Sequence, residues 1–454
     1  MKFVQTLRNI WKIEDLKQRI ITTVWLIIIY RLGTHIVLPG IDPSGLVALK
    51  DQTRGGVMAL LDMFSGGAFS NASVMALGIM PYISASIVMQ LMAIVVPSIQ
   101  KMQREGESGR RKINQWTRYL TIAILLVQGP VYLINLNHQL MAAGSSMPTG
   151  FWFSFSSTIF MAAGSMFALW LGERITDKGI GNGVSFIILV GILARFPMAI
   201  TQEFVLRFNN PGGIFLFLLE ILILLVVIAG AIMLVQGTRR VPVQYAKRTV
   251  GNRMYGGARQ YIPLKVNAAN VMPIIFAQAI MFIPVTLFPA MTSKSTFWQG
   301  FATGQSFWYN FTFAILIILF TYFYTAVTIN PSQMADELKR SNGFIPGVKP
   351  GKPTKEFLDS VMSKITLPGA LFLAIVAILP AFARLFGVSA QFSSFFGGTS
   401  LIILVGVVLD TLQQVESHLL QHHYDGLLET GRIKGRSGNP VSYTHLTLPT
   451  TPYV

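Results

Sequence analysis

Three histidines near the end of the chain are the residues best spaced for metal chemistry. His418 and His422 stand four positions apart and His423 follows directly, so a helix would bring two imidazoles to one face. A hydrolytic zinc site would also need an HExxH pattern or a companion group of carboxylates, and the sequence has neither here. We interpret the histidines as part of a solvated helix end and predict no metal site.

The run Gly-Ile-Gly-Asn-Gly at 179–183 is the segment closest in composition to a phosphate-binding loop. It lacks the spacing of a dinucleotide-binding loop, and no Lys-Ser or Lys-Thr pair follows it. The chain has no cysteine, which excludes disulfides, thiolate zinc sites and cysteine nucleophiles. No serine has an evident His/Asp partner. We therefore predict that the protein is not an enzyme and uses no cofactor.

Ionisable residues are nearly absent from the apolar segments. Arg31, Glu220 and Asp410 are the three that we place within them. A proton- or ion-coupled pump needs paired or clustered charges at membrane depth. We expect instead that Arg31 and Glu220 snorkel from helix ends and that Asp410 makes one structural hydrogen bond.

The composition indicates an integral membrane protein. Of the 454 residues, 52% are hydrophobic and 12% are charged, whereas soluble domains carry about 25% charged residues. The mean hydropathy is +0.54. A spanning helix needs about 20 apolar residues, and ten windows qualify: 20–38, 74–96, 117–136, 152–172, 183–202, 214–236, 269–290, 308–330, 365–385 and 399–420.

Lysine and arginine determine the predicted orientation. With the N-terminus in the cytosol, the cytosolic segments hold 29 of the 36 Lys and Arg residues and the opposite side holds six. This bias places both termini in the cytosol. Residues 1–19 carry five of these cations and apolar residues at helical spacing, so we expect an amphipathic segment on the membrane surface. A solvated basic tail is the alternative.

Five predicted helices lie within residues 20–202 and five within residues 203–420, where the long polar loop 237–268 separates the first of them from the other four. The predicted fold is therefore an all-α polytopic membrane protein with ten transmembrane helices in two pseudo-symmetric halves, at 20–202 and 203–420. A second long cytosolic loop covers 331–364. We predict that the segment 421–438 is a cytosolic tail. Residues 439–454 are rich in Thr and Pro, and we interpret them as a non-native addition. A native disordered tail is the alternative.

Residues 57–73 are too short and too rich in glycine to span a membrane, yet too apolar for an exposed loop. We predict a re-entrant half-helix, because irregular backbone at membrane depth must line a cavity or be buried in protein. In the next helix, Ile79, Ile83 and Ile87 form a stripe on one face. Ordinary packing or lipid contact would explain the stripe. Together with the re-entrant segment, it also suits a wide, uncharged path with a hydrophobic constriction.

Several long runs of residues resemble the SecY family of bacterial protein-conducting channels, over about residues 15–437. They are LPGID at 38–42, MFSGGA at 63–68, ALGIMPYISASIVMQLM at 76–92, REGESGRRKINQWTRY at 104–119, GERITDKGIGNGVS at 172–185, LKVNAANVMPIIFA at 264–277 and FGGTSLIILVGVVLD at 396–410. The resemblance implies ten spans in two pseudo-symmetric halves, in agreement with the topology above.

The resemblance implies a role for each unusual segment. The pore ring would be formed by Ile79, Ile83, Val184, Ile188, Ile275 and Ile403. The plug, which closes the outer funnel at rest, would comprise Asp62, Met63, Phe64, Ser65, Gly66 and Gly67. The lateral gate would lie between the second and third spans and the seventh and eighth, with Ile87 and Gln128 among its residues. Asp62 stands where the family often has asparagine, and Val184 where isoleucine is usual.

The resemblance also implies partners. The small membrane subunits SecE and SecG, the SecA motor ATPase and the ribosome would bind this chain, and its substrates would be unfolded secretory and membrane protein chains. Basic residues of the two long loops would dock the ribosome and motor: Arg239, Arg240, Lys247, Arg248, Arg253, Arg259 and Lys349. Loop 237–268 has seven cations and no acidic residue, which suits contacts with ribosomal RNA phosphates. Lys349 stands where the family often has arginine.

The resulting prediction is a channel in the cell inner membrane that translocates unfolded polypeptides and releases apolar segments sideways into the lipid bilayer. A secondary transporter of a small solute is the alternative, since transporters also use broken helices and internal repeats. Such a transporter needs a polar or charged site at the midplane of the membrane, and the predicted spans carry almost none.

Overall fold

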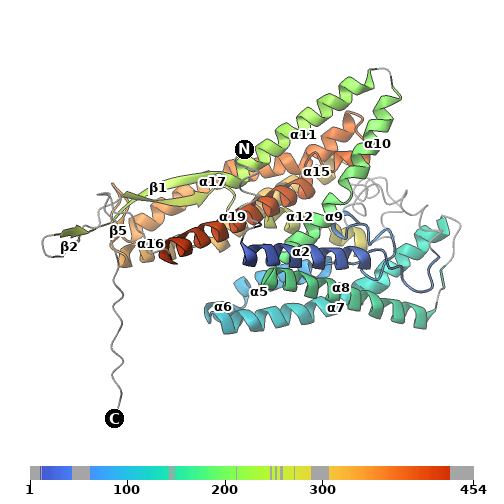
Figure 1. Ribbon diagram of the computed structural model, residues 1–454, viewed down its shortest axis with the longest axis horizontal. Coiled ribbons are helices and arrows are strands. Elements are labelled where there is room, and N and C mark those ends of the chain that lie inside the picture. The colour runs from blue at the N-terminus through green and yellow to red at the C-terminus, as the bar shows by residue number, and fades with distance from the viewer. Residues whose placement is uncertain are drawn as a thin grey trace, which may run out of the picture.

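The computed structural model describes residues 11, 13–42, 62–142, 147–148, 150–210, 212–245, 248–250, 253–255, 259–269, 271–287 and 306–429. Most of them are helical (Figure 1). The helices are α2 (Glu14–Gly33), α5 (Met80–Val95), α6 (Pro97–Arg104), α7 (Glu107–Ala142), α8 (Phe151–Lys178), α9 (Gly183–Leu193), α10 (Phe196–Phe208), α11 (Gly213–Gln236), α12 (Met272–Leu287), α15 (Phe307–Thr328), α16 (Pro331–Arg340), α17 (Lys352–Leu385), α18 (Ala390–Ser393) and α19 (Gly398–Glu429).

Each of the ten predicted windows overlaps at least one of these helices, and 183–202 overlaps both α9 and α10. Among the described residues, seven helices are long and apolar enough to cross a membrane, and α5 with α6 adds an eighth candidate, bent by 104°. Large apolar side chains on α11, such as Phe215, Val226 and Met233, are exposed. Such a surface is stable in hydrocarbon and costly in water. The protein is therefore a multi-pass membrane protein of mostly helical fold, as predicted.

The largest apolar core joins the two predicted halves. Buried side chains from α9 pack with side chains from α11, α12, α15, α17 and α19 in one continuous cluster. Two smaller clusters lie within the first half: one is centred on α7, and the other joins α2, α8 and α9. The proposed boundary between residues 202 and 203 falls inside α10, which continues to Phe208.

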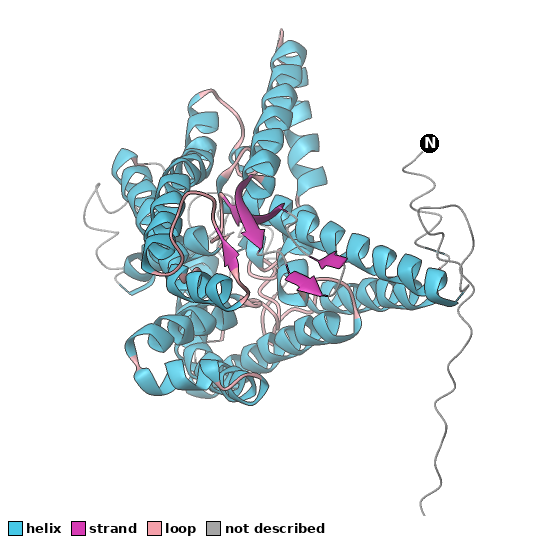
Figure 2. Ribbon diagram, turned by 90° about the vertical axis from the view of Figure 1, so that its left-hand side faces the viewer, coloured by secondary structure: helices cyan, strands magenta, loops and turns pink. Residues whose placement is uncertain are grey.

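The two long loops fold together. Strand β1 (Thr238–Tyr245) pairs antiparallel with β4 (Arg259–Lys265) and with β5 (Gly343–Phe344). A separate hairpin pairs β2 (Arg248–Val250) with β3 (Arg253–Tyr255). Figure 1 places the larger sheet at one end of the molecule, opposite the α10–α11 turn, and Figure 2 looks onto that end with the strands in magenta.

An alternating pattern explains why this segment forms a sheet. Along β1, Val241 and Val243 are buried whereas Arg240 and Pro242 are exposed. This period of two gives the strand one apolar face, which packs with Leu338 of α16 and with Leu358 and Met362 of α17. We name the sheet β4-β1-β5, α16 and the first turns of α17 the sheet unit.

The expected half-helix at 57–73 is different in the structure. Residues 57–61 lie outside the described residues, and from 62 onward only Asp62–Phe64 are helical before a run of turns to residue 79. Two consecutive glycines with positive φ, Gly66 at 67° and Gly67 at 92°, interrupt the helix, because an α-helix requires negative φ throughout. We call residues 62–79 the turn segment.

Both ends of the chain lie largely outside the described residues. Residues 1–10 and 12 are among those not described, and so are residues 430–454. The predictions of an amphipathic N-terminal segment and of a non-native C-terminal addition therefore stay predictions.

One prediction follows from the close approach of α8 to the turn segment. A Cβ atom added at Gly164 would lie 2.3 Å from the backbone oxygen of Val74. Gly164→Ala should therefore destabilise the protein by about 1–3 kcal/mol, although Gly→Ala inside a helix ordinarily stabilises. Thermal unfolding in detergent measures the effect. Gly150→Ala is the control, since nothing lies within 4 Å of its Cβ; equal midpoints for the two variants would contradict the packing.

Candidate functional site

Five of the six predicted ring residues meet at the central core. Ile188 of α9 and Ile403 of α19 are buried members of the cluster that joins the two halves, and Ile83, Val184 and Ile275 are half-buried and pack against it. Four different helices, α5, α9, α12 and α19, therefore direct branched aliphatic side chains to one region.

Ile79, the sixth ring residue, packs in the neighbouring cluster with Tyr30 and Met75. Ile83 and Val184 contact both clusters and so join the two regions. The predicted gate residues lie on adjacent helices: Ile87 is buried on α5, Gln128 is half-buried on α7, and these two helices pack together. Helix α12 packs on α15 in the same way. The roles of the ring and gate residues stay predictions.

The turn segment shares its buried side chains among three apolar clusters. Met63 and Phe64 belong to the central cluster that holds Ile188 and Ile403. Phe69 packs with α7, where its ring meets that of Tyr132 edge to face at a centroid distance of 4.8 Å. Ala68 and Met75 pack with α2 and α8. The segment therefore shares one apolar cluster with predicted ring residues and packs with elements of the first half in the other two.

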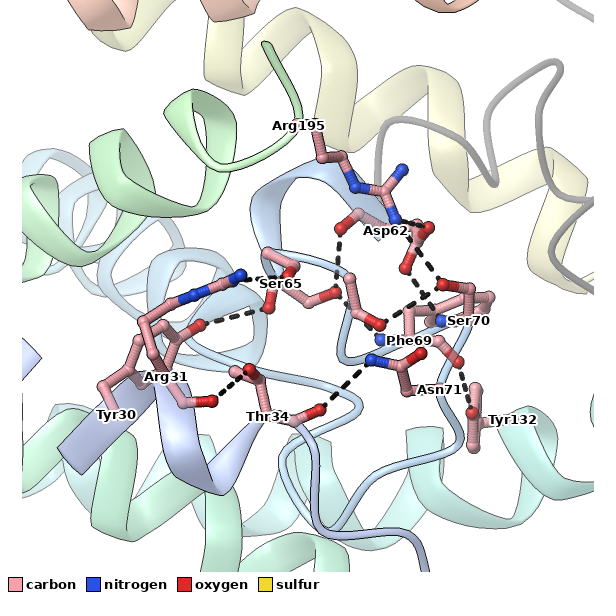
Figure 3. A network of polar contacts seen from close by, with 12 residues as sticks. Tyr30, Arg31, Thr34, Asp62, Ser65, Phe69, Ser70, Asn71, Tyr132 and Arg195 are labelled. Atoms are coloured by element: carbon pink, nitrogen blue, oxygen red, sulfur yellow. Dashed lines mark hydrogen bonds and ion pairs between the residues drawn. The ribbon is translucent and has the colours of Figure 1, made fainter. Parts of the chain in front are cut away.

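An ion pair holds the start of the turn segment to the junction of α9 and α10. Asp62 is only 2% exposed, and its Oδ2 pairs with Nη2 of Arg195 (Figure 3). Its Oδ1 accepts the backbone N–H of Ser70 at 2.8 Å. A buried carboxylate requires such partners, because an unpaired charge in an apolar interior is very costly.

Side chains from two other helices hold the backbone of the turn segment. The hydroxyl of Tyr30 donates to the carbonyl of Ser65, and Nη1 of Arg31 donates to the carbonyl of Gly66 at 2.7 Å. From α7, the Tyr132 hydroxyl donates to the carbonyl of Phe69 at 2.8 Å (Figure 3). These bonds satisfy carbonyls that a regular helix would satisfy internally.

Glycine is required at the point where the turn segment meets α9. A Cβ on Gly66 would lie 3.1 Å from the Cα of Gly191, and a Cβ on Gly191 would lie 3.1 Å from the Cα of Gly66. The two backbones are therefore in direct contact. With its positive φ, Gly66 meets both a steric and a conformational requirement that other residues satisfy poorly.

The structure contradicts the expectation of snorkelling for two charged residues. Arg31 reaches the turn segment instead of a membrane surface. Glu220 is 7% exposed and pairs with Arg207, whose Nη2 lies 2.5 Å from its Oε1. Arg207 also pairs with the buried Glu203, 3.1 Å away. Asp410, for which we expected a structural hydrogen bond, makes none with the described part of the chain.

Sequence analysis missed the residues that hold the turn segment. Tyr30, Tyr132 and Arg195 contact it from 35 or more positions away along the chain. One available signal was Arg31, since an ionisable residue within a span is by default a functional candidate with a partner. Its partner is a backbone carbonyl, which no sequence pattern identifies.

Of the predicted docking residues, the structure places Arg239 and Arg240 on β1 and Lys349 in the turn before α17, all exposed. Lys247 lies outside the described residues, and so do the side chains of Arg248, Arg253 and Arg259. No group of three or more His, Cys, Asp or Glu side chains that could hold a metal ion occurs among the described residues.

Comparison with known proteins identifies extensive similarity. The SecY family model matches residues 73–412. The protein translocase subunit SecY of Streptomyces scabiei is 41% identical over 433 residues, which cover 92% of this chain and 98% of that protein.

Two solved structures share the fold. One is described as "The plug domain of the SecY protein stablizes the closed state of the translocation channel and maintains a membrane seal"; its TM-score is 0.61 at 16% identity, over 90% of this chain and 94% of that one. The other is described as "Sec61 in the Canine ribosome-channel complex from the endoplasmic reticulum". Its TM-score is 0.57 at 15% identity, with the same coverage.

The Asp62–Arg195 pair generates a test of how the turn segment is held. Arg195→Ala leaves the buried Asp62 carboxylate unpaired and should favour local opening by about 1–3 kcal/mol; this figure is discounted because a third of the Arg195 side chain is exposed. Because the chain has no cysteine, Ser70→Cys provides a single buried thiol. Its maleimide labelling should accelerate at least about fivefold in the Arg195→Ala background.

Asp62→Asn combined with Arg195→Ala is the control, because the neutral amide removes the unpaired charge. Labelling in this double variant should fall back toward the parent rate. Equal labelling in all three backgrounds would show that the ion pair does not hold the segment.

Proposed function

The chain belongs to the SecY family, and from this premise we propose that it is the pore subunit of a Sec translocon, which conducts unfolded polypeptides across the membrane and releases apolar segments into lipid. The observation that carries the proposal is the packing of the turn segment in the central apolar cluster. Its Met63 and Phe64 belong to the same apolar cluster as Ile188 and Ile403, so the proposed stopper shares its core with residues that would form the constriction.

The chemistry of the proposed ring suits a substrate of any sequence. Branched aliphatic side chains surround a passing chain without binding particular residues, whereas a charged wall would retain or reject substrates by charge. A narrow apolar constriction also excludes water when no substrate fills it. We therefore infer that the resting seal combines dewetting at the ring with the turn segment as a plug.

Lateral release needs a seam that opens toward lipid. We propose this seam between the α5–α7 pair and the α12–α15 pair, with Ile87 and Gln128 on its first side. A half-buried polar side chain such as Gln128 weakens apolar packing locally, because it contributes little to burial and needs a hydrogen-bond partner. A substrate segment apolar enough to enter lipid would then replace that packing.

We propose that both termini and the sheet unit face the cytosol, in the cell inner membrane. The excess of Lys and Arg on that side supports this orientation. The exposed Arg239 and Arg240 of the sheet unit would contact ribosomal RNA phosphates or the SecA motor, together with the remaining basic residues of the loops. SecE and SecG complete the membrane complex. The chain itself supplies no energy, which would come from SecA, translation or the proton gradient.

A secondary transporter is less well supported. Its substrate site would need polar or charged groups free at the midplane. The buried charged residues Asp62, Glu203 and Glu220 are instead paired with Arg195 and Arg207.

The proposed seal predicts resting ion conductance. Replacing Ile83, Ile188 and Ile275 with Ser should wet the constriction, and deleting residues 62–70 should remove the plug. Each change should raise resting conductance in planar bilayers severalfold, and both together should raise it further. The matched control replaces three exposed isoleucines, Ile223, Ile315 and Ile375, with Ser. Parent-like conductance in all ring and plug variants, with translocation intact, would place the seal elsewhere.

The proposed docking surface predicts a salt-dependent affinity for ribosomes. Arg239→Glu with Arg240→Glu should weaken ribosome binding, and the slope of log affinity against log salt should fall by about one for each phosphate that the variant no longer neutralises. Arg110→Glu with Lys112→Glu makes the same charge change at exposed positions of α7 and should have a smaller effect. Equally weakened binding in the two double variants would mean that net charge, and not the sheet unit, drives binding.

A further inference from the structure

A polar cavity lies between the start of α9 and the middle of α19. Its volume is about 480 Å³, within the usual range for a ligand-binding cavity. It is lined by Asn182, Ser185, Val407, Asp410, Thr411, Gln413, Gln414 and Ser417. The residues predicted to form the ring, the plug and the gate are not among them.

The glycine turn before α9 fixes the geometry of the cavity. The backbone N–H of Gly181 donates to Oε1 of Gln414 at 2.9 Å, which ties the turn to α19. Gly181 has a φ of 80°, a conformation that favours glycine. Next to it, Oδ1 of Asn182 accepts the backbone N–H of Ser185 and caps α9. The Gly181–Gln414 hydrogen bond therefore joins the two walls of the cavity, and the Asn182 cap orders the wall at the start of α9.

These hydrogen bonds determine which polar groups of the lining remain available to a ligand. The side-chain oxygens of Asn182 and Gln414 already accept backbone N–H groups, so their NH₂ groups remain as donors for a ligand's carbonyl oxygens. Among the described residues that line the cavity, Asp410 is the one that is charged. Its side chain is exposed and makes no hydrogen bond or ion pair with the described part of the chain. A carboxylate in this position accepts hydrogen bonds from a cation.

The cavity lies on the cytosolic approach to the proposed ring. Asp410 follows Ile403 by seven residues on α19, or about 10 Å along the helix axis. On α9, Ser185 directly follows Val184 of the ring. The surrounding cytosolic segments carry 29 of the chain's 36 Lys and Arg residues, so a carboxylate here is a local negative site on a basic face.

On the basis of the proposed function, we propose that this cavity binds the positively charged segment that precedes the apolar stretch of a substrate chain. Asp410 pairs with a lysine or arginine of that segment, and the amide donors hold its backbone carbonyls. The bound cation is retained about two helical turns on the cytosolic side of the ring, while the apolar stretch that follows reaches the ring. Asp410 is therefore a specificity residue of the channel.

A divalent metal ion fits the cavity less well. Calcium takes six to eight oxygen ligands, with several carboxylates among them, and the lining supplies one carboxylate. A cationic side chain needs a single carboxylate, and the neutral amides suit an extended backbone.

The test uses reconstituted channels and two substrate chains that differ only in having four or no lysines before the apolar stretch. The parent channel should insert the four-lysine substrate more efficiently with the lysines retained on the cytosolic side. Asp410→Lys should reduce that insertion roughly two- to fivefold, the range of an exposed ion pair, and Asp410→Asn should reduce it less. The lysine-free substrate should insert equally in all channels.

Glu416→Lys is the matched control. It makes the same charge change on the same helix at an exposed position outside the cavity, and it should leave both substrates unaffected. If Glu416→Lys reduced insertion as much as Asp410→Lys, general electrostatics would explain the effect and the site would be rejected. If neither substrate inserted in the parent channel, the proposed function itself would fail.

A proximity measurement provides an independent result. The chain has no cysteine, so Asp410→Cys is a unique thiol. With copper phenanthroline added as the oxidant, a stalled substrate with one cysteine in its basic segment should form a disulfide with it, whereas Glu416→Cys should not. Disulfide formation at both positions, or only at Glu416→Cys, would overturn the assignment.

Discussion

Backbone polar groups at membrane depth must be satisfied inside the protein, and the turn segment shows how this constraint shapes the structure. Its turns leave carbonyl groups that no regular helix would leave, and water is not available to solvate them. Donors from α2 and α7 reach those carbonyls, as Tyr30 does at Ser65 and Tyr132 does at Phe69. The packing of these helices around the segment follows from that requirement.

Many separate contacts hold the turn segment in place. It is held by side-chain hydrogen bonds, one ion pair and apolar contacts shared among three clusters, and the extended sheet ladder that would make it a permanent layer is absent from the described residues. Each contact is modest in free energy, so the closed arrangement is stable only while most of them form together. A substrate that displaces Met63 and Phe64 from the central cluster would weaken the others at the same time.

The fold could be predicted from the sequence much better than the site. Apolar windows located the spans, because hydrocarbon thickness constrains helix length strongly. Short strands could not be inferred in the same way: β1 is recognisable as a strand only once α17 provides an apolar surface for Val241 and Val243. The partners of Asp62, Arg31 and Glu220 are brought to them by tertiary packing, so no local pattern distinguishes these residues from helix-end charges that reach water.

Helix α17 runs from the sheet unit at one end to the contact between Gly387 and Arg207 just beyond the other end. Its 34 residues give a rod about 50 Å long. Leu358 and Met362 fix one end in the core of the sheet unit, and the carbonyl of Gly387, just beyond the other end, accepts a hydrogen bond from Arg207. A push on the sheet unit by a bound partner would therefore tilt this rod and move its far end on the opposite side of the membrane. The helix contains two prolines, Pro368 and Pro380. Bending at these positions would reduce the motion that reaches the far end.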